Sequence, residues 1–318
     1  MTSSASTATP VVVALGGGHG LAASLRALRL LTDQITAVVT VADDGGSSGR
    51  LREEFGVLPP GDLRMALAAL CDDTEWGHQW RDVLQHRFAG EGQLGGHAVG
   101  NLLIVSLLDL LGDTVGGLDL VGRLLNAHGR VLPMAAVPLN IEANVMGADP
   151  AHAFEITTVH GQAEVARTQG RVLSVRLNPQ EPPACDEAVD AIHAADWVIL
   201  GPGSWFTSVI PHLLVPGIHD ALVDTSAKKV LTLNLVMHTV ETAGFSAKNH
   251  LEVLAAHAPG LRLDFVLADP DIVYDEVLLR RVAADMGAEL VLASVGDKLH
   301  RGQHDSLRLA AAYRDIIR

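Results

Sequence analysis

Cysteine, lysine, aromatic residues and long apolar runs are all scarce in this sequence. Its 318 residues contain only 2 cysteines, Cys71 and Cys185, and no Cys-x-x-Cys pair. A disulfide framework is therefore not expected, and the chain suits a reducing compartment. No apolar run is long enough to span a bilayer, and "MTSSASTATP" at the start lacks the basic and apolar parts of a signal peptide. We expect a cytoplasmic protein with no membrane insertion.

Positive charge is also scarce. The 23 Lys and Arg residues face 37 Asp and Glu residues, the formal net charge is −14, and no lysine precedes Lys228. A surface this acidic repels nucleic acid, so we expect no nucleic-acid partner. None of the glycine-rich turns carries the lysine of a Walker P-loop, which excludes that class of nucleotide site. Aromatic residues make up 4%, so the core must consist mainly of Ala, Val and Leu.

Strand-like and helix-like segments alternate along most of the chain. Val11–Leu15 and Ile35–Ala42 read as buried strands, with a glycine turn and a helical pattern between them. The same alternation returns after residue 195 and predicts an α/β fold: a Rossmann-like, doubly wound, mainly parallel sheet with helices on both faces. We expect residues 1–9 to be a disordered tail and 10–318 a single domain. Within it, 130–178 reads as a small antiparallel β insertion or edge subsheet, because short apolar runs there alternate with Gly, Pro and Asn.

Two glycine-rich turns follow expected strands, at the edge of the sheet where ligands bind in such folds. The first turn consists of Gly17, Gly18, His19 and Gly20. Its spacing from Gly18 is G-x-G-x-x-A, a permitted variant of the dinucleotide motif. Such a turn lets the backbone approach a phosphate and leads into a helix with free N–H groups, although a plain strand–helix turn looks the same. The second turn, "LGPGSWFTS", offers Gly201, Gly203, Ser204 and Thr207.

The stretch "VTVADDGGSSGRLR" places two adjacent acids after the second strand. One acid at this position would be enough to bind a ribose. Two adjacent acids suit Mg²⁺ or the hydroxyls of a sugar. The serines, the arginine and the backbone amides of the glycines suit oxyanions. The candidates from this stretch are Asp43, Asp44, Ser47, Ser48 and Arg50. An Asx-type turn with a solvated charge pair is the alternative. If the site binds a ligand, Asp44→Ala should weaken binding without changing the melting temperature.

Two later blocks add further polar candidates. "PPGDLR" supplies Asp62 and Arg64 at a helix start, and "GGHAVGN" supplies His97 and Asn101. Asp62 also suits a helix-capping role, and His97 also suits an ordinary structural histidine. From the residues alone, the adjacent acids Asp43 and Asp44 are the ones that could hold Mg²⁺. No other cofactor and no catalytic residue is assigned.

These blocks together are more specific than any one of them. "GGGHG", "VTVADDGGSSGRLR", "PPGDLR", "HAVGN", "LGPGSWFTSVIPHLLV" and "NLVMHTVETAGFSAKNHLEVL" follow the order and spacing of one family. Essentially the whole chain after the N-terminal tail resembles the YvcK family of gluconeogenesis factors, within the CofD-like superfamily. The chain departs from the family pattern at His19, where Thr is common, and at Thr239–Val240, where Pro-Gly is common. Asn234 is kept and joins the candidate site.

The resemblance implies a cytoplasmic, Rossmann-like protein that binds UDP-sugars, notably UDP-N-acetylglucosamine. It implies a regulator that links gluconeogenic growth to cell-wall precursor supply and cell shape. A membrane Ser/Thr kinase and cell-wall enzymes are the protein partners that this role implies, and we also expect a homo-oligomer.

Three other functions stay open. The related CofD enzymes are Mg²⁺-dependent transferases that move a phospholactyl group to a deazaflavin precursor. This resemblance implies that the acids corresponding to Asp43 or Asp44 and to Asp62 are metal ligands, and we take Asp44 and Asp62 as the candidate Mg²⁺ ligands. The G-x-G-x-x-A turn with Asp43 also allows a NAD-dependent oxidoreductase, and an interaction protein with a vestigial pocket is the third alternative. We favour the UDP-sugar-binding regulator without turnover, because "GGSSGRLREEFGVLPP" resembles the YvcK branch more than the transferase branch.

Overall fold

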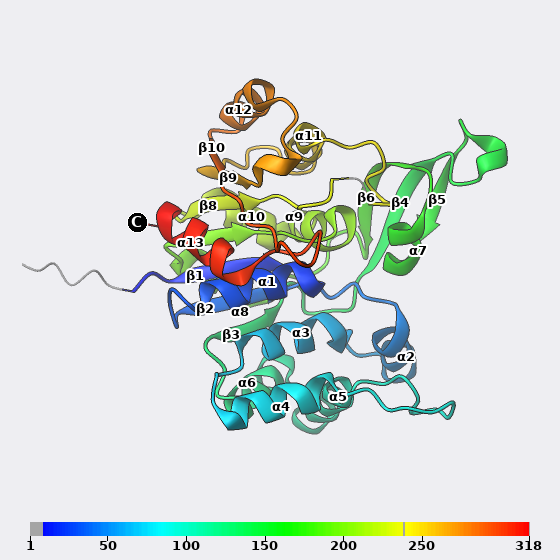
Figure 1. Ribbon diagram of the computed structural model, residues 1–318. Coiled ribbons are helices and arrows are strands. Elements are labelled where there is room, and N and C mark those ends of the chain that lie inside the picture. The colour runs from blue at the N-terminus through cyan, green and yellow to red at the C-terminus, as the bar shows by residue number, and fades with distance from the viewer. Residues whose placement is uncertain (1–8, 238, 318) are drawn as a thin grey trace, which may run out of the picture.

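The computed structural model describes residues 9–237 and 239–317, so most of the expected tail, 1–9, lies outside the described residues. Within them, seven parallel strands form the main sheet, in the order β10-β9-β8-β7-β1-β2-β3 (Figure 1). The strands are β1 (Val12–Gly16), β2 (Ile35–Val39), β3 (Arg130–Pro133), β7 (Trp197–Leu200), β8 (Lys228–Thr232), β9 (Phe265–Ala268) and β10 (Glu289–Leu292). Helices lie on both sides of this sheet, which confirms the expected doubly wound α/β fold.

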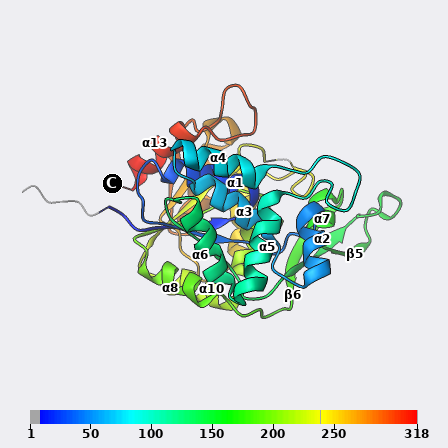
Figure 2. The same cartoon turned by 90° about the horizontal axis from the view of Figure 1, so that it is seen from below.

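The helices form two layers and two outlying groups (Figure 2). One face of the sheet carries α1 (Gly18–Leu28), α3 (Pro60–Leu70) and α13 (Ser306–Ile316), and the other carries α8 (Asp186–Ala194), α9 (Ile210–Leu213) and α10 (Pro216–Asp224). Beyond α3, near the β3 edge, lie α4 (Glu75–Gln85), α5 (Val99–Leu111) and α6 (Thr114–Leu124). Near the β10 edge lie α11 (Ala247–His257) and α12 (Glu276–Asp285).

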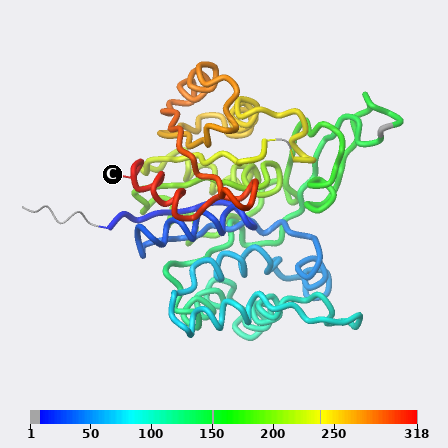
Figure 3. The backbone as a smooth tube through the Cα atoms, viewed as in Figure 1, coloured from blue at the N-terminus to red at the C-terminus, as the bar shows by residue number. Residues whose placement is uncertain are grey.

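The order of the strands reverses beside β1. The chain runs outward from β1 through β2 to β3, then returns to β7 on the other side of β1 and continues to β10. In Figure 3 the blue start of the chain therefore lies in the middle, with cyan segments on one side and orange segments on the other. In open α/β sheets, ligands bind at such a switch point, outside the carboxyl ends of the strands. The fold thus places a candidate crevice between the ends of β1 and β7.

The central strands are apolar along their whole length. All residues of β1, which reads VVALG, and of β7, which reads WVIL, are buried. Continuous apolar runs of this kind are typical of parallel strands with helices on both faces. Polar side chains are consequently displaced to the turns beyond the strand ends.

The segment 130–178 divides between two sheets. Arg130–Pro133 forms β3, which pairs in parallel with β2 at the edge of the main sheet. This position buries the three residues of β3 that follow Arg130. The antiparallel sheet begins later and has the order β5-β4-β6, with β4 (Asn140–Met146), β5 (Ile156–His160) and β6 (Arg171–Asn178). A short helix, α7 (Gln162–Arg167), connects β5 to β6. The antiparallel sheet therefore starts at Asn140, about ten residues after the predicted boundary at residue 130.

Among the described residues, no single helix is long and apolar enough to cross a bilayer. One pair of helical segments, Trp205–Leu213 and Pro216–Asp224, reaches that length together but is bent by 72°.

Candidate functional site

The two glycine-rich turns face each other at the switch point, because β1 and β7 are adjacent parallel strands. A Cβ at Gly20 would lie 2.6 Å from the Cα of Gly203, closer than real Cβ atoms approach other atoms. The hydroxyl of Ser24 in α1 also donates to the carbonyl of Gly201 over 3.1 Å. Glycine at position 20 is therefore required by the contact between the turns.

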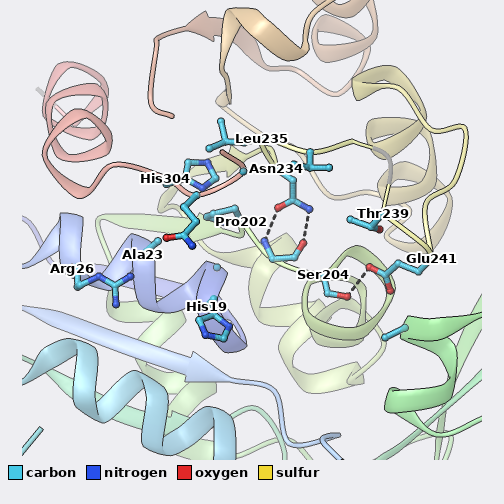
Figure 4. Close-up of a pocket in the computed structure, with 16 residues that line it drawn as sticks. His19, Ala23, Arg26, Pro202, Ser204, Asn234, Leu235, Thr239, Glu241 and His304 are labelled. Atoms are coloured by element: carbon cyan, nitrogen blue, oxygen red, sulfur yellow. Dashed lines mark hydrogen bonds between the residues drawn. The ribbon is translucent and has the colours of Figure 1, made fainter. Parts of the chain in front are cut away.

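A cavity of about 380 Å³ opens beside these turns (Figure 4). Five of the candidates from the sequence line it: His19, Gly20, Gly203, Ser204 and Asn234. The first amides of α1 have no acceptor within the helix, and those of His19 and Gly20 belong to residues on the cavity wall. Free amides at a helix N-terminus favour an anionic group such as a phosphate.

Asn234 fixes the shape of the second turn. Its side-chain oxygen accepts a hydrogen bond from the N–H of Gly203 over 2.8 Å, and its amide nitrogen donates to the carbonyl of Gly203 over 2.7 Å. Gly203 has a φ of 157°, a value that favours glycine. Asn234 therefore acts through the backbone that it holds, besides lining the cavity.

Glu241 covers the amide end of the helical segment after the second turn. Its Oε1 accepts hydrogen bonds from the Ser204 hydroxyl over 2.6 Å and from the Trp205 N–H over 2.7 Å. Burial raises the pKa of Glu241, and its second oxygen, Oε2, has no hydrogen-bond partner among the described residues. Thr207 is almost fully buried and bonds to Ser204. It does not line the cavity, contrary to the prediction from the sequence. The carboxyl group thus occupies the Trp205 amide at the start of this helical segment, where an anion could otherwise bind.

Two acids meet below the first turn. A Cβ at Gly17 would lie 2.5 Å from Oδ2 of Asp62, and the carboxyl of Asp62 accepts a hydrogen bond from the N–H of Gly18. Burial, and next the charge of Asp43, raise the pKa of Asp62 to about 7. A Cβ at Gly61 would lie 2.8 Å from Oδ2 of Asp43, which places that acid at the start of α3 as well. The structure therefore brings together Asp43 and Asp62.

Asp44 lies elsewhere, which corrects its proposed pairing with Asp62. Its Oδ1 accepts a hydrogen bond from the N–H of Ala163 over 2.9 Å, in the first turn of α7. The adjacent acids diverge because Asp43 folds back in an Asx turn onto the N–H of Gly45 over 3.0 Å. Mg²⁺ is commonly held by one or two carboxylates together with phosphates of the ligand, and the Asp43–Asp62 pair fits that pattern. No group of three or more His, Cys, Asp or Glu side chains suited to a metal occurs in the part of the chain described.

Four further candidates are bonded to one another in a buried network. Asn101 receives a hydrogen bond of 2.8 Å from Nε of Arg64 and donates one of 3.0 Å to Oγ of Ser47. Ser47 in turn shares a hydrogen bond of 2.9 Å with Nδ1 of His97. Burial and the charge of Arg50 lower the pKa of His97. The network joins α2 (Gly46–Phe55), α3 and α5, and none of its members lines the cavity at the turns.

The remaining candidates have structural contacts. Arg50 donates to the carbonyls of Gln93 and Gly95 over 3.1 and 2.8 Å. Ser48 packs against Gly61. The block "GGSSGR" begins α2: the N–H of Gly45 bonds to Asp43, and the amides of Gly46, Ser47 and Ser48 lie in the first turn, where they have no acceptor within the helix.

Sequence reasoning missed several residues of the cavity wall. These are Ala23, Arg26, Ala166, Pro202, Leu235, Val236, Thr239, Glu241, Gly302, Gln303 and His304. Burial lowers the pKa of His304 to about 4. Pro202 could have been found from the "GPGS" turn, and Glu241 from the "VETAG" block, whereas Ala166 and His304 come from distant parts of the chain without a recognisable motif.

Comparisons with known proteins show the family and the fold of the chain. The chain matches the family described as "2-phospho-L-lactate transferase CofD" over residues 12–300. A "Putative gluconeogenesis factor" from Mycobacterium tuberculosis is 55% identical over 308 residues, which cover 95% of this chain and 89% of that relative. The "Gluconeogenesis factor" of Bacillus subtilis is 36% identical over 268 residues, covering 84% and 81% of the two chains. A crystal structure of a UPF0052 family member from Bacillus halodurans superposes with a TM-score of 0.84 at 32% identity, covering 95% of this chain and 98% of that one.

Proposed function

The chain belongs to the CofD family, among relatives named gluconeogenesis factors, and from that premise we propose a nucleotide-sugar-binding regulator. Its ligand is UDP-N-acetylglucosamine or a closely related UDP-sugar. The protein acts in the cytoplasm and links carbon metabolism to cell-wall precursor supply and cell shape. A Ser/Thr kinase, cell-wall enzymes and further copies of this chain are its protein partners.

The cavity between the two glycine turns carries this proposal. The diphosphate would lie against the amides of His19 and Gly20, where the dipole of α1 favours negative charge. Hydroxyl groups of the sugar or ribose would bond to Ser204 and Glu241. Leu235 and Val236 supply apolar wall for a base.

A regulator without turnover is part of this proposal, and the hydrogen bonds that the polar groups already make support it. Oε1 of Glu241 already accepts hydrogen bonds from Ser204 and from the Trp205 N–H, so this oxygen is engaged within the protein. The histidine on the opposite wall, His304, is kept neutral by burial. The cavity therefore suits recognition of an intact ligand.

A second function, a CofD-like Mg²⁺-dependent transferase, is favoured by the Asp43–Asp62 pair beside the first turn. These two acids would hold the metal, which would neutralise charge on a phosphoryl group. The position of Asp43, folded against the start of α3, gives no support to a ribose contact of the NAD type.

Calorimetric titration with UDP-N-acetylglucosamine, with and without Mg²⁺, tests the proposal. Micromolar binding, followed by recovery of the intact nucleotide sugar in mass spectrometry, is the expected result. Release of UDP or transfer to a deazaflavin acceptor would favour the transferase. Absent binding in both conditions would refute the UDP-sugar assignment.

A further inference from the structure

We call the cavity beside the two glycine turns the switch-point cavity. A second cavity, of about 540 Å³, shares His19 and Arg26 of α1 with it and extends towards α3 and α4. Its wall is formed by α1, α3 and α4 and by the residues that follow α4. Five arginines and one histidine line it: Arg26, Arg29, Arg64, Arg81, Arg87 and His19. We call it the arginine cavity. Its concentration of positive charge stands out in a chain with a net charge of −14 and 23 Lys and Arg residues in all.

Among the residues that the structure describes, no acidic side chain lines the arginine cavity. Arg29 forms an ion pair of 2.7 Å with Asp73, and Arg81 one of 3.1 Å with Asp82, but both acids are exposed outside the lining. Arg26 has no carboxylate within 4.0 Å among the described residues. The cavity therefore holds more positive than negative charge.

The arginines oppose one another electrostatically. The pKa of Arg26 is lowered, first by burial and then by the charges of Arg29 and Arg81. Burial, followed by the charge of Arg87, lowers the pKa of Arg64 to about 10. An anion in the cavity would relieve this repulsion, and that gain is largest where water is partly excluded.

Three of the five guanidinium groups are also held in place before any ligand arrives. Arg64, at the buried end of the cavity, donates to Asn101 over 2.8 Å and to Gln85. Arg29 donates to the carbonyl of Ala69, and Arg87 donates to the carbonyl of Gly96 over 2.8 Å. A ligand that meets fixed donors loses less entropy on binding than one that must order them.

We propose that the arginine cavity binds a second ligand, a compact polyanion that carries at least two phosphate groups. Guanidinium groups recognise phosphate by paired, charge-assisted hydrogen bonds, and several of them converge here. The volume suits a small phosphorylated molecule. The ridge of His19 and Arg26, which lines both cavities, separates this ligand from the nucleotide sugar and brings the two within reach of the same side chains.

Inorganic pyrophosphate is the probe for the test. Calorimetry should show binding of one pyrophosphate per chain, with an affinity that falls as salt is raised. The double variant Arg81→Gln/Arg87→Gln removes two guanidinium groups that line only the arginine cavity, and should raise the Kd for pyrophosphate about tenfold or more. The matched control, Arg280→Gln/Arg281→Gln, removes the same charge from α12, at the opposite edge of the sheet, and should change the Kd less than about twofold.

Saturation with UDP-N-acetylglucosamine distinguishes two sites from one. Pyrophosphate should still bind to the saturated protein, and Asn234→Ala, which alters only the switch-point cavity, should leave its Kd nearly unchanged. Competition between the two ligands, equal loss in both double variants, or no pyrophosphate binding would each overturn the proposal. If the UDP-sugar fails to bind but pyrophosphate binds in an Arg81- and Arg87-dependent way, the regulator proposal fails and the arginine cavity stands.

Discussion

We predict that Gly20→Ala separates the two turns of the switch-point cavity and disrupts ligand binding. A Cβ at Gly20 would lie 2.6 Å from both the Cα of Gly203 and the carbonyl carbon of Pro202, whereas ordinary van der Waals contact begins at 3.4 Å. The carbonyl oxygen of Pro202 would lie nearer still, at 2.2 Å, so the turns would have to part by about 1.2 Å to reach ordinary contact. All these neighbouring atoms belong to the backbone, so no rotation of a side chain relieves the clash.

The cost follows from this displacement. Overpacking of this kind destabilises a folded protein by about 1–3 kcal/mol, and each kcal/mol lowers the melting temperature by roughly 2–4 °C in a large domain. We expect the Kd for UDP-N-acetylglucosamine to rise about tenfold or more, since a tenfold change requires only about 1.4 kcal/mol. Thermal unfolding followed by circular dichroism and calorimetric titration measure the two effects.

Gly122→Ala is the matched control. A Cβ there has open space, and Gly122 lies within α6, so the substitution should raise stability by about 0.5–1 kcal/mol and leave binding unchanged. If Gly20→Ala kept both the melting temperature and the affinity of the parent, the close contact between the turns would be refuted.

Three further predictions concern the acids and the clamp on the second turn. Because the pKa of Asp62 is raised from 3.8 to about 7, the folded state keeps a proton that the unfolded state loses, so stability should fall as pH rises between these values. Urea unfolding of Asp62→Asn should show a smaller fall, and an equal fall would contradict the assignment. Asn234→Ala removes both hydrogen bonds to Gly203 and should lower the free energy of unfolding by about 1–3 kcal/mol in urea; unchanged stability would argue against the clamp. Asp43→Asn should weaken any Mg²⁺-dependent part of nucleotide-sugar binding in calorimetry, whereas Asp44→Asn should preserve it, and the opposite pattern would identify Asp44 as the metal ligand.

The expected behaviour of Asp44→Ala changes once the contacts are known. The sequence predicts weaker ligand binding with an unchanged melting temperature, since Asp44 then appears beside the ligand. In the fold, Asp44 instead caps α7, so its loss should cost about 0.5–2 kcal/mol, the usual range for a helix cap. Any effect on binding would pass through Ala166, the residue of α7 that lines the cavity.

The local pattern of the sequence was sufficient to predict the strands, turns and helix start that surround the site. The apolar run before Gly16 and the glycines after it predict a buried strand, a turn and a helix start, and Val12–Gly16 and Gly18–Leu28 form in that way. The turn at Gly201–Ser204 follows the same logic after Trp197–Leu200. These features depend on burial and on backbone freedom, which are properties of a few neighbouring residues.

The partners of the polar side chains could not be predicted in this way. Asp43 and Asp44 are adjacent in the sequence, yet one faces Asp62 in α3 and the other caps α7, because the Asx turn at Gly45 sends them in different directions. A pairing across such separations depends on how α3 and α7 pack. No spacing rule along the chain contains that information.

The sequence by itself determined the fold class and the glycine turns at the strand ends, because apolar periodicity and backbone conformation are encoded locally. The family resemblance came from the order and spacing of its motif blocks. Only the tertiary structure decided that Ser47, His97 and Asn101 bond to one another in a buried network instead of lining the cavity. It also gathered arginines from α1, α3 and α4 around one cavity, although they are spread over residues 26–87 of the chain. Charge and hydrogen bonding act between whatever groups the packing of helices brings together, and that packing is a property of the complete fold.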